Sequence, residues 1–304
     1  MEKKQLLGSL LLTLVAVIWG TAFAFQRVGM DLIEPNTFSA SRMTLSALFV
    51  GAVSLFNGKR VTFADAEEKR AYAKSTLVGG VCCGTFLAFA TIFQQMGIVY
   101  TTAGKAGFIT ALYILIVPVM SFVLFGKRYP WTVWFAVLLG VVGLYLLCMT
   151  EQLHLAYGDA LLCVCAAFFS GHILCCDHFV GKGDPIRISA IQFVTVAIIS
   201  WIVAFVMETP SLEKIASALT PILYCGIVSA GIGYTLQIVA QKYTDPTVAS
   251  LLMSLESVFA VLAGALLLNE RMSTRELLGC VIMFTAIVMV QLPTSKSHPS
   301  ADAS

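Results

Sequence analysis

Long apolar stretches separated by short polar connections make up most of this chain. A helix needs about 20 apolar residues to cross the roughly 30 Å hydrocarbon core of a bilayer. Stretches of that length occur at residues 6–26, 36–56, 75–96, 103–125, 130–149, 156–179, 186–207, 216–240, 247–268 and 274–292. The longest connection, from Asn57 to Lys74, is too small for a separate domain. The pattern therefore predicts an all-α membrane protein with ten transmembrane helices.

The composition supports a chain that faces lipid. Apolar residues make up 58% of the chain and charged residues 12%, whereas soluble domains average about 45–50% and about 25%. A soluble domain of this length cannot cover its surface with so few charges. The net charge of +2, without a basic stretch interleaved with aromatic residues, argues against a nucleic-acid partner.

The cysteines and the amino terminus do not change this class. All nine cysteines lie inside apolar stretches, and none has the Cys-His spacing of a zinc site, so we expect small buried apolar side chains. The charged start, Met1–Lys4, resembles the first part of a signal peptide. However, the apolar run that follows reaches about Phe25 without a clear cleavage site, and we interpret it as the first span.

The distribution of lysine and arginine predicts the orientation, because these residues are retained on the cytoplasmic side. With the amino terminus inside, the five basic residues on the outer side are Arg27, Lys105, Lys214, Arg271 and Arg275. The cytoplasmic segments carry thirteen: Lys3, Lys4, Lys59, Arg60, Lys69, Arg70, Lys74, Lys127, Arg128, Lys182, Arg187, Lys242 and Lys296. We expect a multi-pass protein of a bacterial inner membrane with both termini in the cytoplasm.

The two halves of the chain resemble each other. The segment that begins at Glu34-Pro35 aligns with the one at Asp184-Pro185, which also places Trp19 on Phe169. Further on, three matched pairs share another offset: Gln94 with Gln237, Ala106 with Ala249 and Leu112 with Leu255. We predict two five-helix repeats, residues 1–149 and 150–293, and a disordered tail at 294–304. Five spans per unit invert the second copy, and inverted repeats are typical of transporters with a site near the bilayer midplane.

Several short motifs carry a family resemblance. They are Ala16-Val17-Ile18-Trp19-Gly20, Pro35 with Arg42, the run 103–110 leading to Pro118, the run 249–259, and Leu268-Asn269-Glu270-Arg271. With these motifs the whole chain resembles the EamA-type ten-span members of the drug/metabolite transporter superfamily. The resemblance implies export, or less often uptake, of amino acids and related metabolites through a central cavity. Two places depart from the family pattern, Gly126-Lys127-Arg128 instead of an acidic residue and Ser257-Val258 instead of a proline.

Glu256 is the first candidate for the transport site. It lies near the middle of the ninth stretch, roughly 15 Å from its start at 1.5 Å per residue. A charge at that depth costs at least about 2.5–3.5 kcal/mol, so it needs a partner, a water-filled cavity or a route to the surface. Such a carboxyl group could bind a proton or a cationic group of a solute. The alternative is a structural carboxylate that is bonded to a neighbouring helix.

Two basic residues are further candidates. Lys105 begins the fourth stretch among the small residues Gly104, Ala106 and Gly107, and it could hold a solute carboxylate or anchor the helix at the interface. Arg42 lies about a third of the way into the second stretch and has the same two interpretations, with helix packing as part of the second. In the fourth stretch, Pro118 predicts a kink because it lacks a backbone donor.

Neutral side chains complete the candidate site. His172 could relay protons, because histidine titrates near neutrality, or it could be a hydrogen-bonded core residue. Gln94 and Gln237 occupy matching positions in the repeats, so they could line a cavity symmetrically or bond between helices. Three aromatic side chains could stack on a solute or serve packing alone: Trp19, Tyr113 and Tyr234.

Motifs of ATP-driven and hydrolytic proteins are missing from the sequence. Around Gly104-Lys105, Val99 replaces the first glycine of a phosphate loop and Ala106 replaces its Ser or Thr. There is no HExxH and no Gly-x-Ser-x-Gly. We therefore expect no enzyme, cofactor or metal.

These patterns predict a secondary transporter of small organic solutes that works by alternating access. A passive channel or facilitator is the alternative, and a polytopic membrane enzyme is less favoured. The expected partners are the solute, the lipid bilayer and a proton as coupling ion, in a monomer or homodimer.

Overall fold

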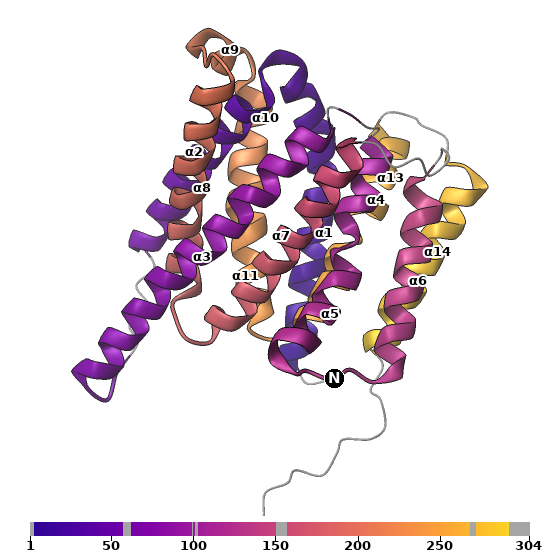
Figure 1. The fold of residues 1–304 in the computed structure, drawn as a ribbon, viewed down its shortest axis with the longest axis horizontal. Helices are drawn as coiled ribbons and strands as arrows, with labels where there is room; N and C mark the ends of the chain where they lie inside the picture. The colour runs from indigo at the N-terminus through magenta and orange to yellow at the C-terminus, as the bar shows by residue number, and fades with distance from the viewer. Residues whose placement is uncertain are drawn as a thin grey trace, which may run out of the picture.

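The computed structural model describes residues 3–56, 62–98, 100, 103–149, 157–267 and 272–291. Within these ranges every regular element is a helix, and the helices form one bundle (Figure 1). In chain order they are α1 (Lys3–Leu32), α2 (Pro35–Phe56), α3 (Ala66–Ile98), α4 (Ala103–Ala111), α5 (Tyr113–Phe125), α6 (Trp131–Cys148), α7 (Tyr157–Val180), α8 (Pro185–Met207), α9 (Leu212–Ser217), α10 (Leu219–Leu223), η1 (Tyr224–Tyr234), α11 (Thr235–Gln241), α12 (Pro246–Met253), α13 (Glu256–Leu267) and α14 (Thr274–Gln291).

The described helices account for the predicted number of spans. Nine helical segments are long and apolar enough to cross a membrane, and a shorter apolar segment, Pro246–Leu262, supplies the tenth. Successive spans alternate in direction, so α14 ends on the face where α1 begins. We call this the N-terminal face and the other the opposite face. The predicted all-α class is confirmed, and the count agrees with ten spans.

The packing of the helices follows the internal repeat. Helices α2 and α8 pack against each other, as do α6 and α14, and each of these pairs joins equivalent spans of the two halves. The start of α2 meets the end of α8, since Asn36 bonds Glu208, so the two equivalent helices are antiparallel. In the same way α3 contacts α7 and α8, while the span formed by α10, η1 and α11 contacts α1 and α2. The second repeat is therefore inverted relative to the first.

Both the fourth and the ninth span are interrupted at equivalent positions. The fourth changes from α4 to α5 at Leu112, and the ninth changes from α12 to α13 at Ser254 and Leu255. At each break the amide bonds the carbonyl three residues earlier, from Leu112 to Ile109 and from Leu255 to Leu252, both at 3.2 Å. Such tightened turns in mid-helix often mark a functional hinge or a sequence under strain.

The predicted kink at Pro118 stays a prediction, and the structure shows a separate break in the same span. Pro118 lies inside α5, and the interruption of the span occurs earlier, at Leu112. The ninth span breaks at the equivalent place although no proline follows within α13. Proline is therefore not the common cause of the two breaks.

The eighth span contains a long π-helical segment, η1. The equivalent part of the first repeat lies within α3, which is a regular α-helix. π-Helical turns are rare and are found frequently at functional sites. This segment also lies against the cavity described below, because it carries Ser229 and Tyr234.

Small residues allow close approach at several helix crossings. A Cβ atom on Gly84 of α3 would lie 2.7 Å from the Gln192 carbonyl oxygen of α8. One on Gly279 of α14 would lie 2.8 Å from the Gly143 carbonyl oxygen of α6. By contrast, Gly51 and Gly107 have nothing within 4 Å. Backbone contact of this kind stabilises helix pairs in lipid, where packing rather than hydrophobicity drives association.

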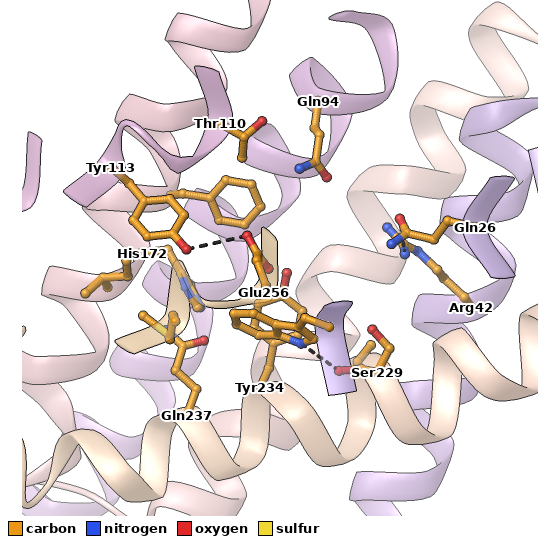
Figure 2. Close-up of a pocket in the computed structure, with 15 residues that line it drawn as sticks. Gln26, Arg42, Gln94, Thr110, Tyr113, His172, Ser229, Tyr234, Gln237 and Glu256 are labelled. Carbon is orange, nitrogen blue, oxygen red and sulfur yellow. Dashed lines mark hydrogen bonds between the residues drawn. The ribbon is translucent and has the colours of Figure 1, made fainter. Parts of the chain in front are cut away.

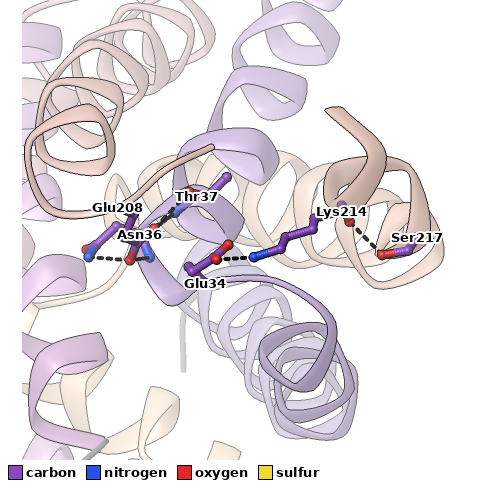
Figure 3. A network of polar contacts seen from close by, with 6 residues as sticks. All are labelled: Glu34, Asn36, Thr37, Glu208, Lys214 and Ser217. Carbon is purple, nitrogen blue, oxygen red and sulfur yellow. Dashed lines mark hydrogen bonds and ion pairs between the residues drawn. The ribbon is translucent and has the colours of Figure 1, made fainter. Parts of the chain in front are cut away.

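Polar contacts tie loops together on the opposite face (Figure 3). The Glu208 carboxylate, at the end of α8, accepts hydrogen bonds from the backbone amides of Asn36 (2.8 Å) and Thr37 (2.7 Å) and from both of their side chains (2.7 Å). It thereby caps the start of α2. Next to it, Glu34 forms an ion pair with Lys214 of α9. The hydrogen bond from Lys214 holds the pKa of Glu34 below its usual value.

A different ion pair ties loops on the N-terminal face. Lys127 Nζ, after α5, lies 2.5 Å from Asp245 Oδ2, before α12. The second carboxylate oxygen of Asp245 accepts the Thr247 amide at 2.8 Å and so caps α12. Partial burial acts to lower the pKa of Lys127, but the hydrogen bond and charge of Asp245 outweigh it and raise that pKa.

Candidate functional site

A cavity lies in the centre of the bundle, beside the breaks in the fourth and ninth spans (Figure 2). The cavity has a volume of about 60 Å³. This is below the range of about 300–1,000 Å³ that is usual for small-molecule sites, so the cavity is narrow in this conformation. Its walls are formed by Trp19, Gln26, Arg42, Gln94, Thr110, Tyr113, Phe169, His172, Ile173, Ser229, Ala230, Tyr234, Gln237, Met253 and Glu256.

Glu256 is the acidic residue of this cavity. It is the first residue of α13, directly after the break in the ninth span. The Tyr113 hydroxyl, on the first residue of α5, donates a hydrogen bond to Glu256 Oε1 at 3.5 Å. Tyr113 is almost fully buried, and its ring lies edge-on to Phe169 with 6.5 Å between the centroids. The carboxylate therefore has a neutral partner and faces the cavity.

Arg42 is the basic residue of the cavity, and its side chain is 5% exposed. Its Nη1 donates to Gln26 Oε1 of α1 at 2.9 Å, and its guanidinium lies 5.5 Å from the centre of the Phe38 ring. In Figure 2 Arg42 and Gln26 lie apart from Tyr113 and Glu256. Arg42 thus points into the bundle, which favours the cavity interpretation over an interfacial anchor.

Aromatic side chains fix the position of the π-helical segment. Trp19 Nε1 of α1 donates to the Ser229 carbonyl oxygen of η1 at 3.0 Å. The Trp19 and Tyr234 ring centroids are 4.7 Å apart, and Gly233 leaves room for the indole. The carbonyl groups of a π-helix are out of α-helical register, so a side chain such as Trp19 can satisfy one of them.

His172 lies in the wall formed by α7 and is fully enclosed. Its Nε2 atom is 2.8 Å from Gln192 Oε1 of α8 and 3.5 Å from Cys176 Sγ. The ring is edge-on to Tyr234 at 5.7 Å. His172 is therefore a buried, hydrogen-bonded residue that also lines the cavity, and its role as a proton relay stays a prediction.

The two glutamines that the repeat aligns also line the cavity. Gln237 of α11 donates to Gln241 at 3.2 Å, and Gln241 in turn donates to the Ile173 carbonyl oxygen at 2.9 Å. Gln94 lies one turn before the end of α3. Thr110 Oγ1 and Gln237 Oε1 are buried and have no hydrogen-bond partner among the described residues. Both can therefore bond water or a solute in the cavity.

The cavity is built from equivalent positions of the two repeats. Four pairs of lining residues are related by the sequence offsets: Trp19 with Phe169, Gln94 with Gln237, Thr110 with Met253 and Tyr113 with Glu256. Only the glutamines are identical, and the other pairs differ in charge or polarity. The positions of the lining residues are therefore related by the repeat, whereas their side chains differ. This difference allows a solute to bind in one orientation.

The structure brings together eight of the nine residues singled out in the sequence. The side chain of Lys105 lies outside the described residues, so its two interpretations stay open. Sequence reasoning missed Gln26, the partner of Arg42, although an amide near the end of an apolar span is a visible signal. It also missed the cavity role of Ser229, whose backbone oxygen, not its side chain, makes the contact.

Among the described residues, no group of three or more His, Cys, Asp or Glu side chains is placed to hold a metal ion. All nine cysteines are free.

Comparisons with known proteins agree with this architecture. A solved crystal structure matches with a TM-score of 0.76 and 18% identity, over 93% of this chain and 96% of that one, which shows a shared fold. An uncharacterized transporter of Archaeoglobus fulgidus is 28% identical over 95% of this chain and 87% of its own length. The uncharacterized transporter YoaV of Bacillus subtilis is 25% identical over 94% and 96%.

The family model of the EamA-like transporters matches the chain twice, over residues 6–149 and 156–292. These two matches take up nearly the whole chain and correspond to the two sets of spans in the bundle. The chain belongs to the EamA-like transporter family.

Proposed function

We propose that this protein is a secondary transporter that moves a small zwitterionic solute, an amino acid or a related metabolite, by alternating access around the central cavity. The observation that carries the proposal is the pair of opposite charges in one cavity, Glu256 and Arg42, each bonded to a neutral side chain. Within the described part of the chain, no ion pair involves either residue. A solute with an ammonium and a carboxylate group supplies both missing counter-charges.

The energetics favour such a solute over a singly charged or apolar one. An isolated charge within the bilayer costs at least about 2.5–3.5 kcal/mol, and charge-assisted hydrogen bonds return about 1.5–3 kcal/mol each. An ammonium group at Glu256 and a carboxylate at Arg42 neutralise both charges together. Trp19 and Tyr234 form an aromatic surface beside them for an apolar or aromatic side chain of the solute.

Family membership and the inverted repeats support a carrier mechanism. In inverted-repeat transporters one half rocks against the other around a fixed central site. We propose export coupled to a proton that Glu256 binds when the solute has left, with the repeats divided near residue 150. We also propose that the N-terminal face is the cytoplasmic face of a bacterial inner membrane.

Counterflow in liposomes tests the proposal. The purified protein is reconstituted with a high internal concentration of each unlabelled amino acid in turn, and uptake of a labelled trace is measured. We expect saturable counterflow for at least one zwitterion. Glu256→Gln and Arg42→Met should each lower it by about tenfold or more, since losing one charge-assisted bond costs about 1.5 kcal/mol.

Two exposed charges provide matched controls. Glu213→Gln and Arg187→Gln remove the same charges outside the cavity and should leave counterflow nearly unchanged. Flux that neither saturates nor shows counterflow would indicate the channel alternative. Equal counterflow in wild type, Glu256→Gln and Arg42→Met would refute the assignment of the site.

A further inference from the structure

Tyr113 and Glu256 occupy the same position in the two repeats. Tyr113 begins α5 after the break in the fourth span, and Glu256 begins α13 after the break in the ninth. The separation between them is the same 143 residues that separates Gln94 from Gln237 and Leu112 from Leu255. The breaks carry the same backbone pattern, since Ile116 bonds the Leu112 carbonyl and Phe259 bonds the Leu255 carbonyl.

The two side chains also touch each other, with 3.5 Å between Tyr113 Oη and Glu256 Oε1. In an assembly of two related halves, equivalent residues can meet only close to the axis that relates the halves. Gln94 and Gln237 are equivalent as well, but Gln237 bonds Gln241 of its own helix instead of its counterpart. The carboxylate of Glu256 therefore lies near the pseudo-twofold axis of the molecule.

A position on this axis has a functional consequence. In an inverted-repeat carrier the two access states exchange the roles of the two halves. A group on the axis keeps the same surroundings in both states, whereas a group off the axis has different neighbouring residues in the two states. Glu256 can therefore be loaded from either face, and the residue that faces it across the axis sets its orientation in both states.

We propose that Tyr113 is the positioning residue for Glu256, and that the pair can be exchanged across the axis: a carboxylate on α5 with a phenol on α13 rebuilds the same site. This inference rests on the proposed transport function for its flux readout. It names a role for the pair that goes beyond solute binding, because it ties the site to the symmetry of the two half-helices.

The exchange is tested with four variants. Tyr113→Glu and Glu256→Tyr are made singly and together, and Tyr113→Phe removes only the hydroxyl. The singles should lose counterflow by about tenfold or more, because one places two carboxylates and the other two phenols at the axis. The double exchange should show counterflow at least about threefold faster than the better single variant. The effects of substitutions at contacting residues depend on each other by a factor of about two to 140. Tyr113→Phe should move the pH dependence of counterflow to higher pH, since a hydrogen bond to the ionised carboxylate is lost.

A matched exchange away from the axis serves as the control. Trp19 and Phe169 are also equivalent, but Trp19 bonds the π-helical segment, which has no counterpart in α3. The combination Trp19→Phe with Phe169→Trp should therefore show no recovery over its single variants. Recovery in both exchanges, or in neither, would overturn the inference.

A second readout keeps the two proposals separable. The midpoint of thermal unfolding in detergent micelles is measured for the same variants as a function of pH. If the wild type transports no solute, the proposed function fails, yet the inference still requires that the double exchange restores the wild-type midpoint and pH response. If the wild type transports and the double exchange is no more stable or active than its singles, the inference alone fails.

Discussion

We predict that the ion pair on the N-terminal face limits how often that face opens. Lys127 and Asp245 are 2.5 Å apart, with 42% and 28% of their side chains exposed. Their Coulomb energy in water is about 1.7 kcal/mol at this distance. Side-chain entropy and salt reduce the net value of exposed pairs to about 0.2–1 kcal/mol, so we take about 1 kcal/mol as the upper limit. This corresponds to at most about a fivefold change in the open population.

The variant Asp245→Asn removes the charge and keeps an oxygen for the cap on Thr247. Asp184→Asn is the matched control, because Asp184 caps α8 in the same Asp-Pro context, with amide bonds at 2.9 and 3.2 Å. Unlike Asp245, Asp184 lies 3.9 Å from its nearest basic atom, on Arg187. The difference in effect between the two variants therefore reports the loss of the ion pair with Lys127, separately from the loss of a helix cap.

Hydrogen exchange measured by mass spectrometry is the assay. The amides of Gly126 and Lys127 bond Phe122 and Ser121, so their exchange reports opening of this loop. Asp245→Asn should speed their exchange by up to about fivefold, and about 1 M salt should remove most of the difference, as the Debye length falls to about 3 Å. Because the pKa of Lys127 is raised, the ion pair contributes its full stabilisation below pH about 10.4. This stabilisation is lost as the pH rises above that value. Equal exchange in wild type and Asp245→Asn at low salt would refute this reasoning.

Two further predictions concern helix packing and the opposite face. Gly279→Ala should destabilise the protein by about 1–2 kcal/mol, because its Cβ would lie 2.8 Å from backbone atoms of α6 and the helix-propensity gain offsets only part of the cost; Gly51→Ala, with nothing within 4 Å, should be neutral or stabilising. Chemical unfolding in micelles checks this, and shifts of the same sign in both would contradict it. The pair of Glu34 and Lys214 should stabilise the protein above pH about 4.5 and lose its effect as the pH falls below that value, because the pKa of Glu34 is lowered. Unfolding of Lys214→Met across pH 3–7 tests this, since the variant should differ from wild type only at the upper end.

The spans, their alternation and the repeat were accessible from the residue pattern. Within a bilayer each helix must satisfy its own backbone hydrogen bonds, so the positions of spans follow from local hydrophobicity. The alignment that places Gln94 on Gln237 and Leu112 on Leu255 also reaches Tyr113 and Glu256. Buried charges and amides in apolar surroundings are costly, and this is why Glu256 and Arg42 stood out before any fold was known.

Which of these side chains meet could not be read from the same pattern. Lipid is as apolar as a helix interface, so hydrophobicity does not specify which face of a span turns inward. The contact of Tyr113 with Glu256, the bond of Arg42 to Gln26 and the break at Leu112 all depend on how helices distant in sequence pack together. The π-helical segment is the clearest case, because its register is matched by Trp19, which lies 210 residues away in the chain. Close packing of whole helices selects these contacts, and no local preference of the residues encodes them.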